Sequence, residues 1–318
     1  MNVALITGIS GQDGLYLTDF LLKKNYKVIG TSRNNQKTKK IISTDILKKI
    51  TLVEWDLVSS DILDSIIKKY NPNEIYNFAA YSSGETMYDK PKEMMLINGY
   101  AVVTILDSIL NNNVKIKFCQ ASSSEMFGVV TEVPQSETSK FKPQNPYAKA
   151  KLYAHKQISH FRDNKGLFAC SAILYNHESP RRGKNFVTRK ITNQAARIKL
   201  SLQNKLELGD ISARRDWIHS KDAIKALYLM MQSNEPSDYV VASGEVHSVE
   251  EFCEVAFSHL GLDYKDYVIQ SKSHFRNHDS VKLIGNASKI RDLGWTPEYS
   301  FEEIVKEMVD SDLEDLIS

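Results

Sequence analysis

The sequence predicts an α/β fold in which a doubly wound parallel sheet is followed by a smaller C-terminal α+β domain. Three observations support this prediction. Over the first 175 residues, short apolar runs alternate with amphipathic helical patterns, which is typical of strands buried on both faces and joined by right-handed crossovers. Glycines follow the first apolar run directly. After residue 175 the alternation ends, and short strands are mixed with helices.

The expected strands are runs of apolar and β-branched residues, and the expected helices carry apolar residues at three- and four-residue spacing. The first strand, 2–7, ends in glycines, and the helix after Gly11 continues to about Lys24. Strands then follow at 28–32, 51–55, 74–80, 115–122 and 168–175, with helices at about 60–70, 91–111 and 146–164. Beyond them we expect helices near 186–202, 248–260 and 301–309 and strands at 205–209 and 238–243.

Length and pattern together divide the chain into two predicted domains, because domains average about 150 residues. Residues 1–175 form the sheet domain, to which a segment near 216–245 returns, and residues 176–318 form most of the second domain. The acidic stretch from Glu302 to Asp315 is interpreted as a solvated helix face.

The composition is that of an ordinary globular chain, with 42% hydrophobic and 25% charged residues. The net charge of +2 argues against nucleic acid or an anionic membrane as the main partner. Cys119, Cys170 and Cys253 are far apart and without a CxxC pair, which argues against disulfides and a zinc site. The N-terminal apolar run follows no basic residues, and no stretch approaches the roughly 18 apolar residues of a membrane helix. We therefore expect a cytoplasmic protein that binds no metal.

A glycine-rich turn follows the first strand, with Gly8, Gly11 and Gly14 at G-x-x-G-x-x-G spacing. Glycine allows positive φ and close backbone approach, and the amides of the next helix then point at a pyrophosphate. The strand–turn–helix context indicates a dinucleotide-binding site of the Rossmann type in residues 1–175, rather than a structural turn without a ligand. Gln12 and Asp13 lie in the same turn and belong to the predicted cofactor site.

The end of the second strand predicts which dinucleotide binds. An acidic residue there would favour NAD, but the sequence has Arg33 between small polar residues, which suits the 2′-phosphate of NADP. NAD stays possible, since Arg33 could be an ordinary surface arginine. After the third strand, Asp56 could hold the adenine amino group next to Leu57, and small side chains after the fourth strand would let the dinucleotide lie close, at Ala79 and Ala80.

A candidate catalytic set consists of Ser123, Tyr147 and Lys151. Tyr147 and Lys151 are four residues apart on a predicted helix, so they share one face. An ammonium and a positive nicotinamide ring would lower the pKa of the phenol, which could then take a proton from a sugar or alcohol hydroxyl. Ser123 follows a central strand, at the edge of the sheet where ligands bind, and could bridge the same hydroxyl.

The glycine turn and the Ser–Tyr–Lys set resemble the extended short-chain dehydrogenase/reductase family, whose members bind a nucleotide sugar. Glu125 extends the set beyond a simple dehydrogenase of that family. A carboxylate in the same pocket could remove the C5 proton after C4 of the sugar is oxidised, and loss of the C6 hydroxyl would follow. The cofactor would then be a shuttle that is not consumed. Glu125 is not decisive, because it could be a structural residue and nucleotide-sugar decarboxylases also carry a glutamate in this turn.

A basic segment from Tyr175 to Lys190 lies where the sheet pattern ends, which is a natural crevice for a ligand. Arg189, Arg215 and Arg276 could clamp a diphosphate there, although each could also be a surface residue.

Within the extended short-chain dehydrogenase/reductase family, the chain resembles the GDP-mannose 4,6-dehydratase family nearly end to end. The matching stretches are GISGQDGLYL, QASSSEMFG at 120–128, NPYAKAKLYAH at 145–155, the basic segment with its YNHESPRRGKNFVTRK, RRDW at 214–217 and SGEVHSVEEF at 243–252.

The resemblance implies roles for individual residues. Ser123 stands where that family usually has threonine, Glu125 matches its general base, and Tyr147 and Lys151 match its proton-transfer pair. His177 and Arg182 look like further cofactor contacts. The implied contacts to the GDP-sugar are Asn176, Asn185, Val187, Arg189, Lys190, Arg215 and Arg276. The resemblance also implies a homodimer or homotetramer.

The leading hypothesis is a lyase that converts GDP-mannose to GDP-4-keto-6-deoxymannose by internal hydride transfer. The alternative is a related enzyme for another GDP-sugar such as GDP-manno-heptose, acting as a 4,6-dehydratase or as a C4 dehydrogenase or epimerase. The sequence departs from the family pattern at three places. AAYSSGETMY after the fourth strand and Asn277, where the family has proline after Arg276, bear on the identity of the sugar. The basic loop after Arg33 lacks the usual family insert, which bears on tetramer formation. A non-catalytic binding module is a third hypothesis, against which the complete catalytic set argues.

Overall fold

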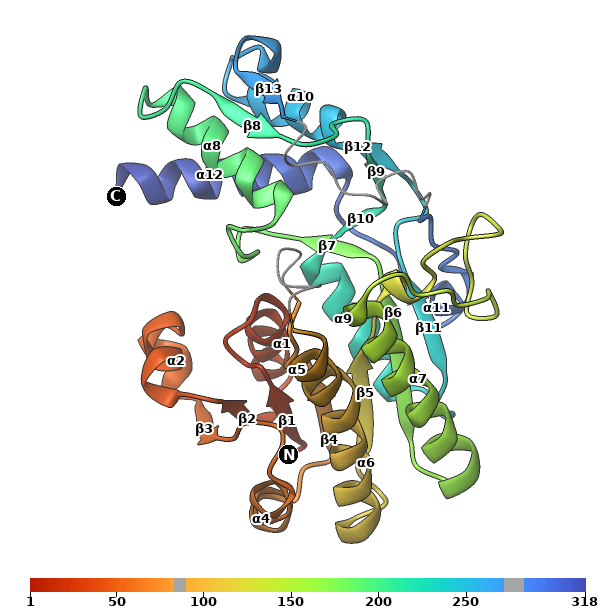
Figure 1. Ribbon diagram of the computed structural model, residues 1–318. Coiled ribbons are helices and arrows are strands. Elements are labelled where there is room, and N and C mark those ends of the chain that lie inside the picture. The colour runs from red at the N-terminus through yellow and green to blue at the C-terminus, as the bar shows by residue number, and fades with distance from the viewer. Residues whose placement is uncertain (83–89, 272–282) are drawn as a thin grey trace.

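The computed structural model describes residues 1–82, 90–271 and 283–318. A seven-stranded parallel sheet crosses its lower part (Figure 1), in the order β11-β6-β5-β4-β1-β2-β3. The strands are β1 (Val3–Thr7), β2 (Lys27–Ser32), β3 (Ile50–Glu54), β4 (Glu74–Asn77), β5 (Lys117–Ala121), β6 (Ala169–Leu174) and β11 (Asp238–Val241). The predicted doubly wound α/β fold is confirmed. From β1 the chain adds β2 and β3 on one side of the sheet, and from β4 it adds β5, β6 and β11 on the other side. The topological switch point therefore lies between β1 and β4.

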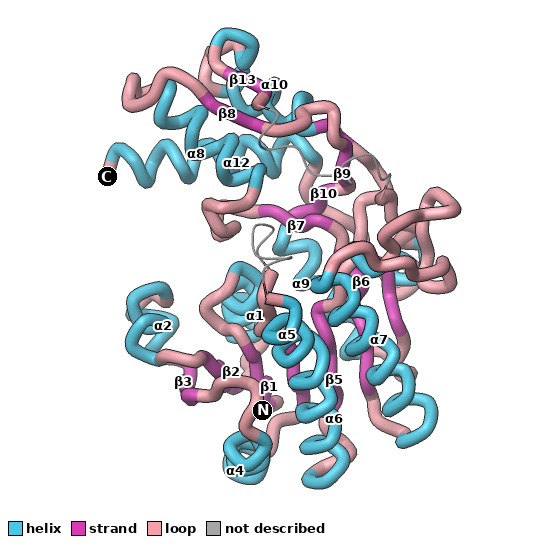
Figure 2. Tube along the Cα trace, in the orientation of Figure 1, coloured by secondary structure: helices cyan, strands magenta, loops and turns pink. Residues whose placement is uncertain are grey.

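Helices cover both faces of the sheet (Figure 2). On one face, α1 (Gln12–Lys23) and α9 (Ser220–Gln232) bury leucine, isoleucine and methionine side chains against the strands. On the other face lie α4 (Ser60–Tyr70), α6 (Ala101–Asn112) and α7 (Pro146–Lys165). Burial on both faces explains why the strands read as continuous apolar runs.

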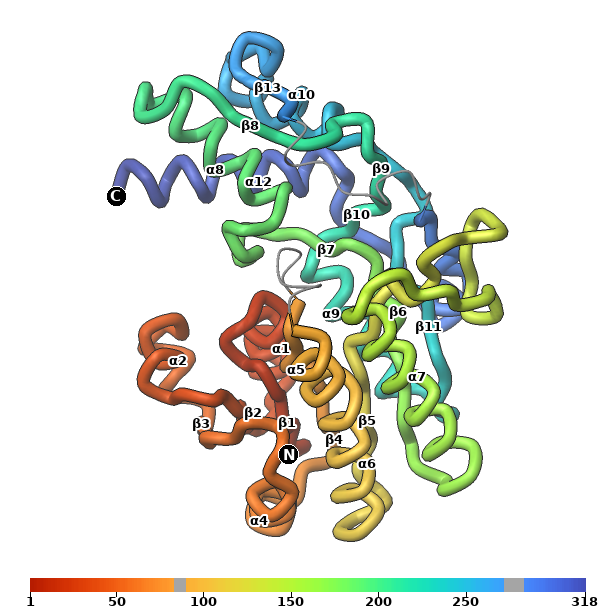
Figure 3. Tube along the Cα trace, in the orientation of Figure 1, coloured from red at the N-terminus to blue at the C-terminus, as the bar shows by residue number. Residues whose placement is uncertain are grey.

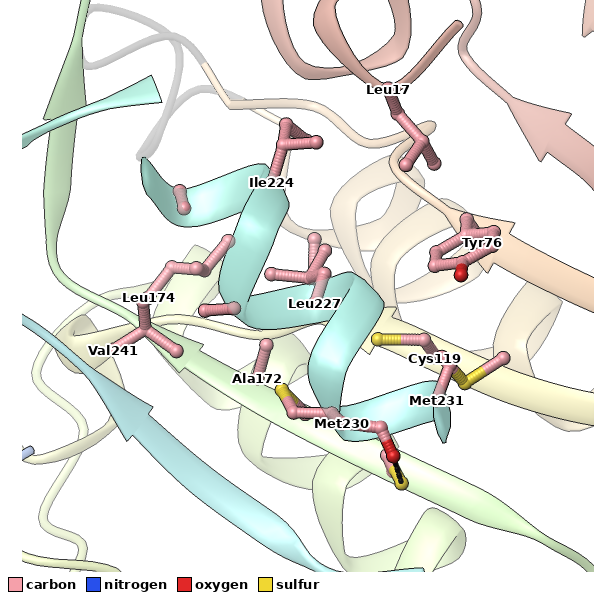
Figure 4. Packing of buried hydrophobic residues seen from close by; sticks show 14 of the residues in the cluster. Leu17, Tyr76, Cys119, Ala172, Leu174, Ile224, Leu227, Met230, Met231 and Val241 are labelled. Carbon is pink, nitrogen blue, oxygen red and sulfur yellow. Dashed lines mark hydrogen bonds between the residues drawn. The ribbon is translucent and has the colours of Figure 1, made fainter. Parts of the chain in front are cut away.

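The packing of α9 shows how the later half of the chain completes the sheet domain. Leu227 and Met230 lie over Ala172 of β6, and Val241 of β11 lies beside Leu174 (Figure 4). Strand β11 pairs in parallel with β6, so residues 238–241 return to the sheet. This agrees with the expectation of a returning segment near 216–245.

A second core lies above the carboxyl ends of the strands. Helices α8 (Val187–Lys199), α10 (Val249–His259) and α12 (Phe301–Ile317) pack around Trp217, Phe252 and Met308. The chain passes between the two cores through residues 175–219 and again after β11 (Figure 3). Two short strand pairs lie along this passage: β7 (Asn176–Glu178) with β10 (Trp217–His219), and β9 (Arg214–Arg215) with β12 (His247–Ser248). A third pair, β8 (Leu206–Leu208) with β13 (Val268–Gln270), packs on the second core itself. The domain boundary at residue 175 stays a prediction.

The remaining elements show where the sequence pattern was insufficient. Residues 35–47, expected as a loop, form α2 (Asn35–Ile41) and α3 (Thr44–Leu47), because the Asn34 side chain caps the polar helix α2. Strand β4 stops at Asn77, before the expected residue 80. The helix expected at 91–111 contains a π-helical turn between its two parts. Its parts are α5 (Pro91–Met95), η1 (Leu96–Tyr100) and α6, and the other short helices are η2 (Ser124–Met126), η3 (Tyr264–Asp266) and α11 (Ser288–Arg291).

The acidic C-terminal helix α12 is not solvated all round. It buries an apolar stripe in the second core, and its Asp312 is 0% exposed. The interpretation of residues 302–315 as a solvated face therefore holds only for the outer side of the helix and is wrong for Asp312.

One continuous helical stretch in the described part of the chain, Pro91–Asn112, is long and apolar enough by length and composition to cross a membrane. Half of its most apolar window is buried inside the protein. Its α6 part packs against α4 and α7, as a core helix does.

Candidate active site

The glycine turn lies at the switch point of the sheet and is packed tightly. Gly8 has φ +66°, and a Cβ on it would lie 2.9 Å from the Ala79 amide nitrogen beyond β4. A Cβ on Gly14 would lie 2.5 Å from the Gly8 carbonyl oxygen. The turn therefore requires glycine at both positions, which agrees with the predicted motif.

This turn fits a dinucleotide. The helix α1 begins at Gln12 with Gly11 as its N-cap, and no side chain caps its first amides. These amides stand at the carboxyl end of β1, where the helix dipole favours a pyrophosphate. Arg33 follows β2 and is exposed, with its guanidinium 5.8 Å from the centre of the Tyr81 ring.

The residues predicted beyond the third and fourth strands are arranged as turns. Asp56 is exposed, and its carboxylate accepts hydrogen bonds from the amides of Val58 and Ser59. Leu57 is buried with φ +74°. Ala79 is half-buried and donates its amide to Thr7 Oγ1, while Ala80 is also half-buried. Their contacts to a cofactor stay predictions.

Three side chains of the catalytic set meet above the end of β5. Tyr147 and Lys151 lie on the first turns of α7 and are almost fully buried. Ser123 caps η2 and is close enough to Tyr147 for its hydroxyl to lower the pKa of the phenol, while the Lys151 ammonium lies 5.7 Å from the centre of the Tyr147 ring. Lys151 Nζ donates to the Ala121 carbonyl at 2.7 Å. The helical spacing thus brings the predicted set together.

Burial controls the acidity of this set. It raises the pKa of Tyr147 to about 12, and the charge of Glu125 adds to that effect, whereas Ser123 opposes it. Burial also lowers the pKa of Lys151 to about 8, against the negative charge of Asp13. For the protein side chains alone, desolvation outweighs the lowering effects of Ser123 and Arg182 on the pKa of the phenol. The expected lowering also requires the positive nicotinamide ring, so it stays a prediction.

A buried polar ladder connects the glycine turn to Lys151. Thr7 Oγ1 donates to Asn77 Oδ1 at 2.5 Å, and Asn77 Nδ2 donates to Gln120 Oε1 at 2.7 Å. Gln120 Nε2 then donates to the Ala121 carbonyl, the same oxygen that accepts from Lys151. The ladder crosses β1, β4 and β5 where each strand ends. It fixes the carbonyl that holds the ammonium.

Glu125 lies on η2, two residues after Ser123, and is only partly buried. Its Oε2 accepts a hydrogen bond from Asn145 Nδ2 at 3.2 Å. Its backbone amide donates to Ser123 Oγ, also at 3.2 Å. The backbone of Glu125 is therefore fixed next to Ser123, and its carboxylate is held by Asn145, two residues before Tyr147.

The predicted cofactor residues Asp13 and His177 form an ion pair, with His177 Nε2 3.1 Å from Asp13 Oδ2. Burial opposes ionisation of both side chains, but the charge and hydrogen bond of the partner, together with the other neighbours, outweigh burial: Arg182 and Gln12 for Asp13, and the Tyr175 carbonyl for His177. The pKa of Asp13 is lowered, and that of His177 is raised. Gln12 joins the same segment by donating to the His177 carbonyl and accepting from Ser179. Arg182 stacks on Phe186, at 3.7 Å from the ring centre.

The predicted GDP-sugar contacts come from several elements. Arg189 is 4% exposed in its side chain, and its guanidinium is paired with Asp312 of α12 at 2.6 Å. It also donates to the carbonyls of Pro180 and Arg182. The structure thus gives Arg189 a structural role, and direct contact with a diphosphate stays a prediction.

The other predicted GDP-sugar contacts in the described residues are more exposed than Arg189. Lys190 Nζ donates to the Glu207 carbonyl, and Arg215 donates to the Arg214 carbonyl. Asn185 and Val187 are exposed, and Asn176 lies half-buried on β7. Arg276 lies outside the described residues, so convergence of the three arginines stays a prediction.

The residues that support the site were not among the predicted site residues. Gln120 and Asn77 lie in expected strands, and a polar side chain in a buried strand is itself a signal of a specific partner. Asn145 was predictable as a helix cap, because it precedes Pro146. Its bond to Glu125, 20 residues away, was not predictable. The described residues contain no group of three or more His, Cys, Asp or Glu side chains suited to a metal ion.

The fold and this site together define the class of protein. A parallel sheet with a glycine turn at its switch point, a Ser–Tyr–Lys set at the next strand ends and a second core above them is typical of an extended short-chain dehydrogenase/reductase. Solved structures agree on the fold. UDP-glucose 4-epimerase from Thermotoga maritima superposes with a TM-score of 0.87 at 22% identity, over 99% of each chain. dTDP-glucose 4,6-dehydratase from Bacillus anthracis, in complex with NAD, gives 0.83 at 22% identity, over 99% of this chain and 97% of that one.

Sequence comparison identifies the family. The family model described as GDP-mannose 4,6 dehydratase matches residues 5–308. GDP-mannose 4,6 dehydratase 2 of Arabidopsis thaliana is 45% identical over 98% of this chain and 87% of its own length. The human GDP-mannose 4,6 dehydratase is 40% identical over 98% of this chain and 92% of its own. The chain belongs to the GDP-mannose 4,6-dehydratase family.

Proposed function

We propose that this chain is a lyase that converts GDP-mannose to GDP-4-keto-6-deoxymannose, and that Ser123, Glu125, Tyr147 and Lys151 perform the chemistry. The observation that carries the proposal is the position of Glu125. Its backbone amide donates to Ser123 Oγ, its carboxylate accepts a hydrogen bond from Asn145 Nδ2, and its negative charge is close enough to Tyr147 to raise the pKa of the phenol. A C4 dehydrogenase needs only Ser123, Tyr147 and Lys151. The added carboxylate supplies the base that an elimination requires.

Tyr147 and Ser123 act first in this proposal. Both hydroxyls bind the C4 hydroxyl of the sugar, and Tyr147 takes its proton as C4 is oxidised. The Lys151 ammonium, held by the Ala121 carbonyl, stabilises the phenolate. A nicotinamide dinucleotide, when bound, supplies a positive charge, accepts the hydride from C4 and returns it to C6.

Glu125 acts after this oxidation. The C5 proton is acidic once C4 is a ketone, and the Glu125 carboxylate removes it. The C6 hydroxyl then leaves as water with one proton, so the sugar loses one water in total. Return of the hydride to C6 and of a proton to C5 completes the product. The sequence is redox-neutral, because the hydride that leaves C4 is the one that arrives at C6.

The residues that would hold the dinucleotide are those of the glycine turn, together with Asp13, Arg33, His177 and Arg182. We propose NADP rather than NAD, because Arg33 is exposed beyond β2, with no acidic residue from Thr31 to Asn34 to bind a ribose 2′-hydroxyl. Arg33→Ala should raise the KM for NADP and leave the KM for NAD nearly unchanged. Equal KM changes for both cofactors would contradict this choice.

GDP-mannose is the substrate that the names of the curated relatives give, and nothing favours the alternative of a heptose. The test compares the two GDP-sugars with catalytic amounts of cofactor. We expect faster turnover of GDP-mannose and a product lighter by one water. Faster turnover of the heptose would contradict the substrate. A product without loss of water would contradict the elimination.

A cytoplasmic location and a homodimeric or homotetrameric assembly complete the proposal. Both rest on the sequence, and size measurement of the purified protein tests the assembly.

A further inference from the structure

Asn145 makes two hydrogen bonds in opposite directions. Its Oδ1 accepts from the Ala148 amide at 2.8 Å, which caps helix α7. Its Nδ2 donates to Glu125 Oε2 at 3.2 Å. The residue is 5% exposed, so water competes little for either bond. One side chain therefore links the helix of Tyr147 and Lys151 to the turn of Glu125.

The chemistry of helix caps shows why this residue is informative. Asn, Asp and Ser are all good caps, because each offers an oxygen to the free amides of the first turn. Of the three, only Asn also carries an NH₂ group at the same end of its side chain. A serine would cap the helix without reaching Glu125, and an aspartate would place a second carboxylate beside it. Capping alone therefore does not explain Asn145.

The bond also matches the carboxylate of Glu125 by type. An ionised carboxylate has only acceptors, and Asn145 Nδ2 supplies a donor. The ionised form is the one that removes a proton. The C4 oxidation uses Tyr147, Ser123 and Lys151, to which Asn145 makes no hydrogen bond in the described structure.

We propose that Asn145 is a positioning residue that holds the Glu125 carboxylate in register with Tyr147, and that it serves the elimination and not the preceding oxidation. The inference rests on the proposed function of Glu125. It adds a structural link between the oxidation and the elimination. The Asn145 side chain connects Glu125, the base of the elimination, to helix α7, which carries Tyr147 and Lys151 for the oxidation.

The experiment uses Asn145→Ser and Asn145→Asp, both of which keep the cap. With GDP-mannose and stoichiometric oxidised cofactor in a single turnover, we expect C4 oxidation at nearly the wild-type rate. Elimination should slow by about 10- to 100-fold, the loss expected for one charge-assisted hydrogen bond. Reduced cofactor should therefore accumulate, and deuterium from the solvent should enter C5 more slowly. A purely structural role would slow both steps equally.

A double-variant comparison provides the control. In a Glu125→Gln background, Asn145→Ser should add almost nothing to the defect, because the base that Asn145 positions is already lost, although the Gln amide oxygen can still accept the hydrogen bond. The inference would be overturned if Asn145→Ser slowed elimination as much in the Glu125→Gln background as in the wild-type protein. It would also be overturned if Asn145→Ser alone eliminated water at the wild-type rate. Failure of the wild-type protein to dehydrate GDP-mannose would instead remove the proposed function itself, and the inference with it.

Discussion

The buried ion pair between Arg189 and Asp312 joins α8 to α12 and gives a sharp prediction of stability. The Asp312 carboxylate is 0% exposed and accepts from Arg189 Nε and Nη2 at 3.1 and 2.6 Å. It also accepts from Thr192 Oγ1 at 2.6 Å and Asn193 Nδ2 at 3.0 Å. Asp312→Asn removes the charge at nearly constant volume. The Arg189 guanidinium is then buried without a counter-charge.

Breaking such a pair costs about 3–5 kcal/mol of the free energy of unfolding. That is a large part of the roughly 5–15 kcal/mol that stabilises a typical domain. Urea unfolding followed by circular dichroism measures the loss. The matched control is Asp310→Asn on the same helix, where the exposed Asp310 pairs with His259 at 2.6 Å. We expect the control to change stability by under about 1 kcal/mol.

A second variant separates the loss of the pair from the burial of a lone charge. Replacing both partners, as Arg189→Met with Asp312→Leu, should recover most of the stability, because well-packed apolar residues can replace a buried pair. The reasoning is refuted if Asp312→Asn and Asp310→Asn lose equal amounts of stability. It is also refuted if the double replacement is as unstable as Asp312→Asn.

Three further predictions concern the site. Gly14→Ala should disrupt the cofactor turn and abolish dinucleotide binding in calorimetry, because its Cβ would meet the Gly8 carbonyl at 2.5 Å; normal affinity would contradict the packing. Gln120→Leu should slow turnover by roughly 10-fold at unchanged KM for the sugar, since the Ala121 carbonyl loses its support and Lys151 shifts. Activity should fall as pH rises through about 8, because Lys151, whose pKa burial lowers to about 8, then loses the proton that makes it an ammonium. A pH profile flat to pH 10 would show that Lys151 acts in some other way.

The sheet could be predicted well from the sequence because its strands are buried on both faces. Each such strand is a continuous apolar run, and the glycine turn marks the first crossover. The helix over residues 35–41 could not be predicted in this way. Its sequence, NQKTKKI, has no apolar stripe, and its one specific signal is the cap from Asn34.

The candidate site could be predicted as a set of residue types, but its electrostatics and supports could not. The fixed spacing of a helix placed Tyr147 and Lys151 together, as expected. The direction of the Tyr147 pKa depends on burial, which a local pattern does not measure. Asp312 lies in an acidic run that looks solvated, and its partner Arg189 is 123 residues away. Contacts of that range exist only in the folded chain.

The central claim is that Glu125, Tyr147 and Lys151 perform a redox-neutral dehydration of a GDP-sugar. The most direct measurement combines product mass with the near-ultraviolet absorbance of reduced cofactor, during turnover of GDP-mannose with catalytic amounts of NADP. We expect a product lighter by one water and no net reduction of cofactor. A keto-sugar that keeps its water, formed with one reduced cofactor per sugar, would contradict the claim.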